Sequence, residues 1–102
     1  MITAIRSASI HEGKSAEALA WAVKLTSHLR DKLGANTQLT RNIGGPVYQI
    51  HWISTYPSLA DMEKSFKQIE ADEGYKTLVG EARKQALLVA SSIVDTLYQT
   101  IA

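Results

Sequence analysis

The sequence predicts an α+β fold, in the order β-α-β-β-α-β, with a four-stranded antiparallel sheet and helices on one face. Three observations predict it. Alternating apolar residues at 2–10 indicate a strand, and a helical apolar stripe at 15–33 follows it. A Gly-Gly-Pro turn at 44–46 separates two further extended segments. A capped helix and a last extended segment complete the order, which is that of a split β-α-β unit.

The first strand and the first helix have the clearest patterns. Within 2–10, Ile5 interrupts the alternation, which indicates partial burial of both sheet faces. The helix at 15–33 has Ser15 as its expected N-cap and Gly34 as its expected left-handed end. Its apolar stripe, at spacings of three and four, consists of Ala18, Ala22, Leu25, Leu29 and Leu33.

The turn at 44–46 is predicted to join a weaker strand at 37–43 to a third strand at 47–55. A helix is expected directly afterwards. Ser58 is its N-cap, and Asp61 three residues later makes a weak form of the capping box, in which Glu or Gln is preferred.

The second helix is predicted to break at 72–74, where Gly74 follows two acidic residues. A short helix over 75–84 and a last strand over 87–101 are expected next. That strand is long, since strands are usually about 5–6 residues. The resulting sheet has one face without helices, and a second copy packed about a two-fold axis is the simplest cover for it.

The composition sets the class of protein. The 102 residues make one small domain, 45% hydrophobic and 21% charged. A net charge of +1, from 11 basic and 10 acidic residues, lacks the basic signature of a nucleic-acid binder. No cysteine is present, and no apolar run approaches the roughly 20 residues of a membrane span. We therefore expect a cytoplasmic protein with no nucleic-acid or membrane partner.

Four short segments of the chain resemble the NIPSNAP-like branch of the dimeric α+β barrel proteins, whose subunits have the ferredoxin-like fold. They are Ile5-Arg6, the turn Ile10-His11-Glu12-Gly13-Lys14, Trp52 with Ser58-Leu59-Ala60, and Asp72-Glu73-Gly74-Tyr75. The resemblance implies a homodimer whose two sheets enclose a lumen. Members of the superfamily include cofactor-free monooxygenases of the antibiotic-biosynthesis type, haem-degrading enzymes, decarboxylases and isomerases. The fold therefore does not select one function.

The third strand carries the main candidate site residue, His51. Gln49 and His51 share one face of that strand, and Tyr48, Ile50 and Trp52 share the other. The aromatic set suits packing under the helices, which leaves His51 and Gln49 toward the lumen. An imidazole there is a candidate general base, and the alternative is a hydrogen bond across the barrel.

Three charged residues complete the candidate set. Arg6 has small neighbours and is a candidate to hold a carboxylate or an enolate-like oxygen beside His51, or else to pair with Asp95. Arg41 lies near a hairpin end and is a weaker candidate. A carboxylate within a strand is unusual, so Asp95 is predicted to pair with Arg6, to orient His51, or to protect a sheet edge.

These residues support two functions. The first is a homodimer that binds a small organic molecule, without cofactor or metal, since the three histidines lack metal-ligand spacing. The second is a cofactor-free monooxygenase or isomerase that uses His51 and Arg6. An RNA-binding domain shares the element order, but the charged residues that it needs are missing from the third strand.

Overall fold

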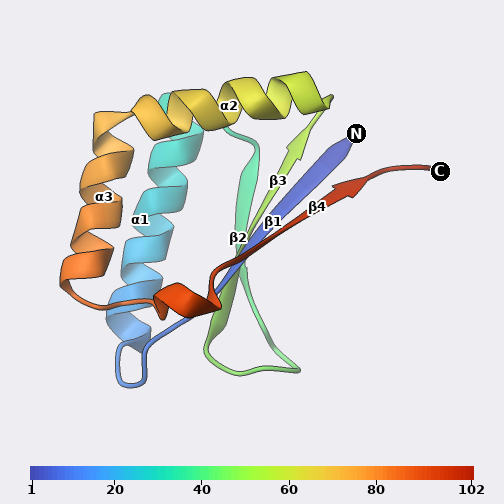
Figure 1. Ribbon diagram of the computed structural model, residues 1–102. Coiled ribbons are helices and arrows are strands. Elements are labelled where there is room, and N and C mark those ends of the chain that lie inside the picture. Colours follow the sequence, from blue (N-terminus) through green and yellow to red (C-terminus); the bar gives the residue numbers. More distant parts are fainter.

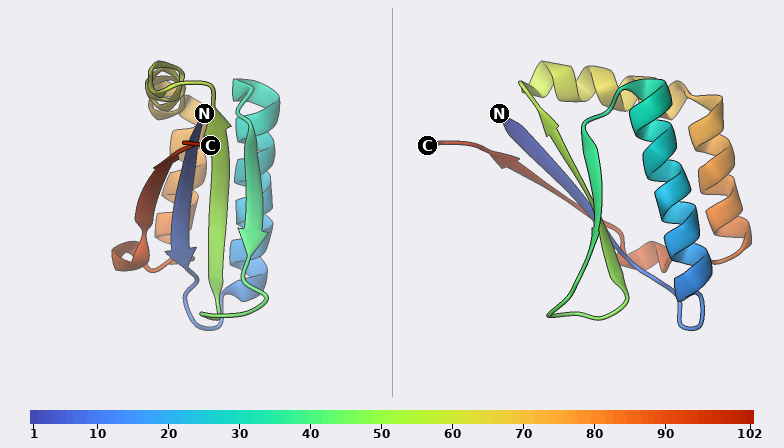
Figure 2. Two further views of the ribbon diagram at one scale, coloured as in Figure 1. Left: turned by 90° about the vertical axis from the view of Figure 1, so that its right-hand side faces the viewer. Right: turned by 180° about the vertical axis from the view of Figure 1, so that it is seen from behind.

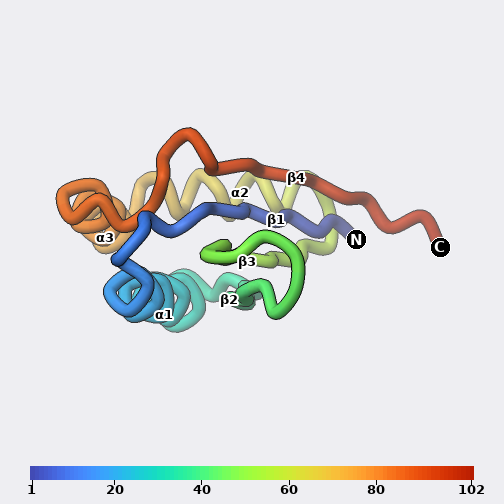
Figure 3. Tube along the Cα trace, turned by 90° about the horizontal axis from the view of Figure 1, so that it is seen from below, coloured from blue at the N-terminus to red at the C-terminus, as the bar shows by residue number.

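The structure, a computed structural model, describes residues 1–102 and has the predicted ferredoxin-like order (Figure 1). In chain order the elements are β1 (Ile2–Ser9), α1 (Ser15–Leu33), β2 (Thr37–Arg41), β3 (Gln49–Tyr56), α2 (Leu59–Ala71), α3 (Glu73–Lys84), the 3₁₀ turn η1 (Ala90–Ser92) and β4 (Val94–Gln99). The antiparallel sheet has the strand order β2-β3-β1-β4 (Figure 3). None of the helices is both long and apolar enough to cross a membrane.

All helices lie on one side of the sheet (Figure 2). The register of the two central strands places Arg6 opposite Trp52 and Ser7 opposite His51. Since successive side chains of a strand point to opposite faces, Arg6 and Trp52 share the face toward the helices. Ser7 and His51 share the face away from them.

The core lies between α1, α3 and the centre of the sheet. Ile50 is fully buried there, and the rings of Trp21 and Trp52 meet edge to face at 6.0 Å. Both indole N–H groups have acceptors. Trp21 Nε1 donates to the carbonyl of Leu78 at 2.7 Å, and Trp52 Nε1 donates to Thr26 Oγ1 at 3.1 Å. The prediction that both tryptophans belong to the core is confirmed, and these bonds fix their orientation.

The helix ends follow the sequence signals with one exception. Ser58 caps α2 by accepting from the Asp61 N–H at 3.2 Å, and Gly34 ends α1 with a left-handed φ of 65°. The predicted cap at Ser15 is wrong, because α1 begins at Ser15 and Lys14 precedes it without a side-chain cap.

The break between α2 and α3 is narrower than predicted. Only Asp72 lies outside the two helices, and its carboxylate caps α3 by accepting from the Tyr75 N–H at 2.8 Å. The same carboxylate contacts His28 Nε2 of α1 at 2.6 Å. Both hydrogen bonds lower the pKa of the Asp72 carboxyl, and the one with His28 has the larger effect. Asp72 therefore forms the junction between α2 and α3 and connects this junction to α1 through His28.

Two strand predictions are corrected. The segment 87–101 is not one strand, because Ser92 bonds the backbone of Ser9 and Val89 and supports the turn η1 before β4 begins. The third strand begins at Gln49 rather than at residue 47. Tyr48 has a left-handed φ of 59° and is exposed, so its predicted place in the core is wrong.

Candidate functional site

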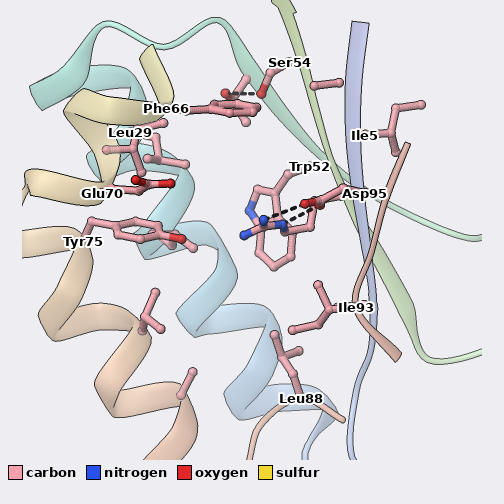
Figure 4. A pocket seen from close by; sticks show the side chains of 18 of the residues that line it. Ile5, Leu29, Trp52, Ser54, Phe66, Glu70, Tyr75, Leu88, Ile93 and Asp95 are labelled. Atoms are coloured by element: carbon pink, nitrogen blue, oxygen red, sulfur yellow. Dashed lines mark hydrogen bonds and ion pairs between the residues drawn. The ribbon is translucent and has the colours of Figure 1, made fainter. Parts of the chain in front are cut away.

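The principal cavity lies between the sheet and the helices, with a volume of about 530 Å³. Its wall includes side chains of β1, β3 and β4 on one side and of all three helices on the other (Figure 4). Most of the lining is apolar or aromatic, including Trp21, Trp52, Tyr56, Phe66, Leu25 and Leu29. Two of its lining residues, Asp95 and Leu97, belong to β4 and are exposed, so the cavity is open to solvent along this strand.

An ion pair between β1 and β4 stands on the sheet side of the cavity. Arg6 Nε donates to Asp95 Oδ1 at 2.7 Å, and Arg6 Nη2 donates to Asp95 Oδ2 at 2.8 Å. The two residues are direct partners in the antiparallel register, which fixes this bidentate geometry. The bond raises the pKa of Arg6 and lowers that of Asp95, so both groups are charged. About half of each side chain is exposed.

The helical side of the cavity supplies two more polar groups. Figure 4 shows the Tyr75 ring reaching from the start of α3 toward the ion pair, and the Glu70 carboxylate beside it. Tyr75 makes a smaller contribution than Asp95 to the raised pKa of Arg6. Polar groups from four elements, β1, β4, α2 and α3, therefore line a cavity whose wall is otherwise mostly apolar.

The deeper polar groups of the cavity already have partners. The hydroxyls of Thr37 and Ser54 bond each other at 2.7 Å, and the indole N–H groups are occupied as described above. No buried side-chain polar atom lacks a hydrogen-bond partner. Hydrogen bonding to a ligand therefore falls to the groups at the opening, and the interior offers apolar contact.

His51 lies on the opposite face of the sheet. Its Nδ1 is 2.6 Å from the Ser7 hydroxyl, and its Nε2 contacts Asn42 Oδ1. Because the Asn42 amide nitrogen donates to the carbonyl of Pro46 at 2.8 Å, its oxygen faces the ring. His51 Nε2–H then donates, and Nδ1 accepts from Ser7. The ring is held within the sheet face by neighbours from β1 and the loop after β2.

The expectation that His51 and Arg6 act in one lumen is wrong, because a sheet separates them. His51 lines neither the principal cavity nor a second hollow near the β2–β3 loop. Arg41 and Gln49 line that second hollow, away from Arg6. Of the five predicted site residues, Arg6 and Asp95 form an ion pair, which was one of the alternatives expected for each of them.

Two residues at the cavity were missed by the sequence reasoning. Tyr75 was noted only as part of a family-like segment, and Glu70 was not singled out. An available signal was the spacing of Phe66, Ile69 and Glu70 along α2, which places them near one face of the helix. No three His, Asp or Glu side chains come together in a cluster that would hold a metal ion.

The chain has the ferredoxin-like α+β fold, and several solved structures share it. An uncharacterised NIPSNAP domain protein from Burkholderia xenovorans is 14% identical, with 100% of this chain and 96% of that chain covered and a TM-score of 0.82. A NIPSNAP family protein from Agrobacterium tumefaciens is 19% identical, with coverages of 98% and 92% and a TM-score of 0.80.

The oxygenase branch has the same fold at lower similarity. SnoaB, a cofactor-independent oxygenase from Streptomyces nogalater, is 15% identical, with 97% of this chain and 91% of that chain covered and a TM-score of 0.68. No protein-family model and no curated protein matches the sequence. The similarity is therefore a similarity of fold. It agrees with the predicted ferredoxin-like fold and with the resemblance to NIPSNAP-like proteins.

Proposed function

We propose that this protein is a homodimer that binds a small organic molecule in the cavity between sheet and helices. The observation that carries the proposal is the cavity itself, about 530 Å³ with a mostly apolar wall and a few polar groups on its sheet and helical sides. A space of this size matches ligand sites in proteins, which are about 300–1,000 Å³. Such a wall favours the apolar body of a ligand, and the Arg6–Asp95 pair and Tyr75 favour its polar end.

The aromatic side chains support a ligand with a flat ring. Trp21 and Trp52 meet edge to face at 6.0 Å, and Tyr56 and Phe66 do so at the same distance. All four line the cavity. Aromatic pairs of this kind offer ring faces and edges to a further ring, which adds roughly 0.5–1.5 kcal/mol per contact.

The alternative is a cofactor-free monooxygenase or isomerase, which needs a base beside the ligand. His51, the candidate base, is on the other side of the sheet. Within the cavity the carboxylates of Asp95 and Glu70 are the titratable acceptors, and Asp95 is held by Arg6. Binding without chemistry is therefore the function that these side chains support best.

The proposal of a homodimer is based on the uncovered face of the sheet and on the exposed strand β4. Val94 and Tyr98 are more than half exposed on that face, and Leu97 is half exposed on the other face of the same strand. An apolar edge strand without cover is a site for association. A second copy of the sheet would cover this face.

Binding is tested by calorimetric titration of the protein with naphthalene carboxamide, a flat neutral compound. Val79→Trp fills the cavity from α3, where Val79 is half-buried in its wall. Val23→Trp makes the same change on α1, at an exposed position outside the wall. We expect V79W to weaken binding at least about tenfold and V23W to leave it unchanged. Equal binding by both variants, or none by the wild type at millimolar concentration, would contradict the proposal.

The homodimer is tested by light scattering after size exclusion at micromolar concentration. Tyr98→Lys places a charge on the uncovered face, and Val23→Lys places one on the outer side of α1. We expect a dimeric mass for the wild type and V23K, and a monomeric mass for Y98K. A monomeric wild type would refute the dimer while leaving the cavity proposal intact.

A further inference from the structure

We infer that the cavity selects neutral hydrogen-bonding ligands against carboxylates, and that Asp95 is the residue that sets this selection. The inference rests on the proposed function, because it names the ligand class of the same cavity. It differs from the expectation drawn from Arg6 alone, which is a site for a carboxylate.

The first argument is that the Arg6 guanidinium is already paired with an anion, the Asp95 carboxylate. Asp95 takes the Nε–H and one Nη2–H in a bidentate bond at 2.7 and 2.8 Å. A guanidinium has five N–H donors, so three remain for other acceptors. A ligand carbonyl or hydroxyl oxygen can use one of them without disturbing the pair. A ligand carboxylate would instead share Arg6 with an ionised Asp95, whose lowered pKa keeps it charged.

The second argument is the charge of the whole wall. The charged residues that line the cavity are two cations and two anions: Arg6, Arg83, Glu70 and Asp95. Glu70 adds its negative charge beside Tyr75, on the side of the cavity across from the ion pair (Figure 4). An anionic ligand between them would face carboxylates from both sides. Arg83, on the last turn of α3, and Glu70 are both exposed, so water screens both charges, and the wall as a whole offers no excess of positive charge to an anion.

The third argument concerns displacement. A carboxylate ligand that replaced Asp95 on Arg6 would leave the Asp95 carboxylate without its partner next to the new anion. The lost attraction to Arg6 and the repulsion between the two carboxylates both disfavour this exchange, although water reduces both effects because the pair is half exposed. A neutral ligand avoids this cost. Ligands that carry both a donor and an acceptor, such as amides and phenols, would also use the acceptors on Glu70 and Asp95.

The test compares naphthalene carboxamide with naphthalene carboxylate at pH 7.5, by calorimetry on the intact protein. We expect the wild type to bind the amide at least about tenfold more tightly than the carboxylate. Asp95→Asn keeps the side-chain shape and releases Arg6 for the anion, so we expect the preference to fall to about one or to reverse. Asp31→Asn on α1, an exposed position outside the cavity wall, is the control for net charge and should keep the wild-type preference.

Glu70→Gln gives a second measurement if D95N does not fold, because Glu70 is outside the ion pair. It should lower the preference for the amide in the same direction. Equal or tighter binding of the carboxylate by the wild type would overturn the inference while the proposed function stands. An unchanged preference in both D95N and E70Q would overturn it as well. Binding of neither compound would remove the proposed function, and the inference with it.

Discussion

The contact between Gly74 and His28 gives a prediction whose sign depends on the tertiary structure. Gly74 is the second residue of α3, and its φ is not left-handed. A Cβ at this position would lie 2.5 Å from Cε1 and 2.8 Å from Nε2 of His28. The His28 ring is not free to move away, because Asp72 holds it at 2.6 Å. Gly74→Ala therefore forces His28 away from Asp72.

The size of the effect follows from two opposed terms. Alanine in place of glycine stabilises a helix interior by about 1 kcal/mol, and this is an upper bound for Gly74 in the first turn of α3. Overpacking against a fixed neighbour costs about 1–3 kcal/mol. We expect G74A to lower the free energy of unfolding by about 1 kcal/mol in the wild type and to raise it by up to about 1 kcal/mol in the His28→Ala background. The coupling between the two sites would then be about 2 kcal/mol.

Urea unfolding followed by circular dichroism measures these differences, with all variants at one protein concentration because a dimer's stability depends on it. Gly80→Ala is the matched control. Gly80 lies in the same helix, and a Cβ there would meet nothing within 4 Å. G80A should stabilise both backgrounds by about 1 kcal/mol. If G74A stabilised the wild type as much as G80A does, the contact would not constrain the structure and the reasoning would be refuted.

Three further predictions concern the core, a helix end and the ion pair. Ile50→Ala removes a fully buried side chain and should lower the free energy of unfolding by about 2–5 kcal/mol. Ile53→Ala, on the uncovered face, should lower it clearly less. Urea unfolding measures both. Ser58→Ala should lower the free energy of unfolding by about 1 kcal/mol through the lost cap of α2, and Ser58→Thr, which keeps the hydroxyl, should restore most of it. Arg6 lowers the pKa of Asp95 in the folded protein. The ion pair therefore stabilises the fold fully above the unfolded-state pKa of about 3.9. That stabilisation is lost as the pH falls through the lower, folded-state pKa. Between pH 5 and pH 2 the wild type should therefore lose more stability than D95N, by at most about 1 kcal/mol since the pair is half exposed.

Much of the fold was predictable from local patterns. The α1 stripe, the Ser58 cap, the left-handed Gly34 and the break near Asp72 each depend on residues a few positions apart. The last strand was predicted too long because the residues at 87–90 are apolar and Ile93 follows close behind them. Ser92 interrupts it through bonds to Ser9, more than eighty residues away in the chain. Tyr48 was misplaced because a strand pattern was extended into a turn whose backbone is left-handed.

The site was less predictable. Alternation along a strand correctly placed His51 and Trp52 on opposite faces, and it correctly placed Arg6 with the small residues of β1. The alternation could not show that the cavity lies on the helical face of the sheet, because the position of the cavity depends on the distance of α2 and α3 from β4. Tyr75 and Glu70 enter the cavity because of the angle between α2 and α3, which Asp72 and His28 set together.

The sequence by itself determined the element order and which neighbouring strand residues lie on opposite faces, because strand periodicity and local caps are short-range properties. It left the pairing of Arg6 with Asp95 as one alternative among several, since the two residues are 89 positions apart. Only the tertiary structure decided which face holds the cavity and which residues surround it. The spacing of helices from a sheet is a sum of packing contacts among residues far apart in the chain, and no local pattern encodes that sum. His51 and Arg6, which the sequence placed in one lumen, are for this reason found on the two sides of one sheet.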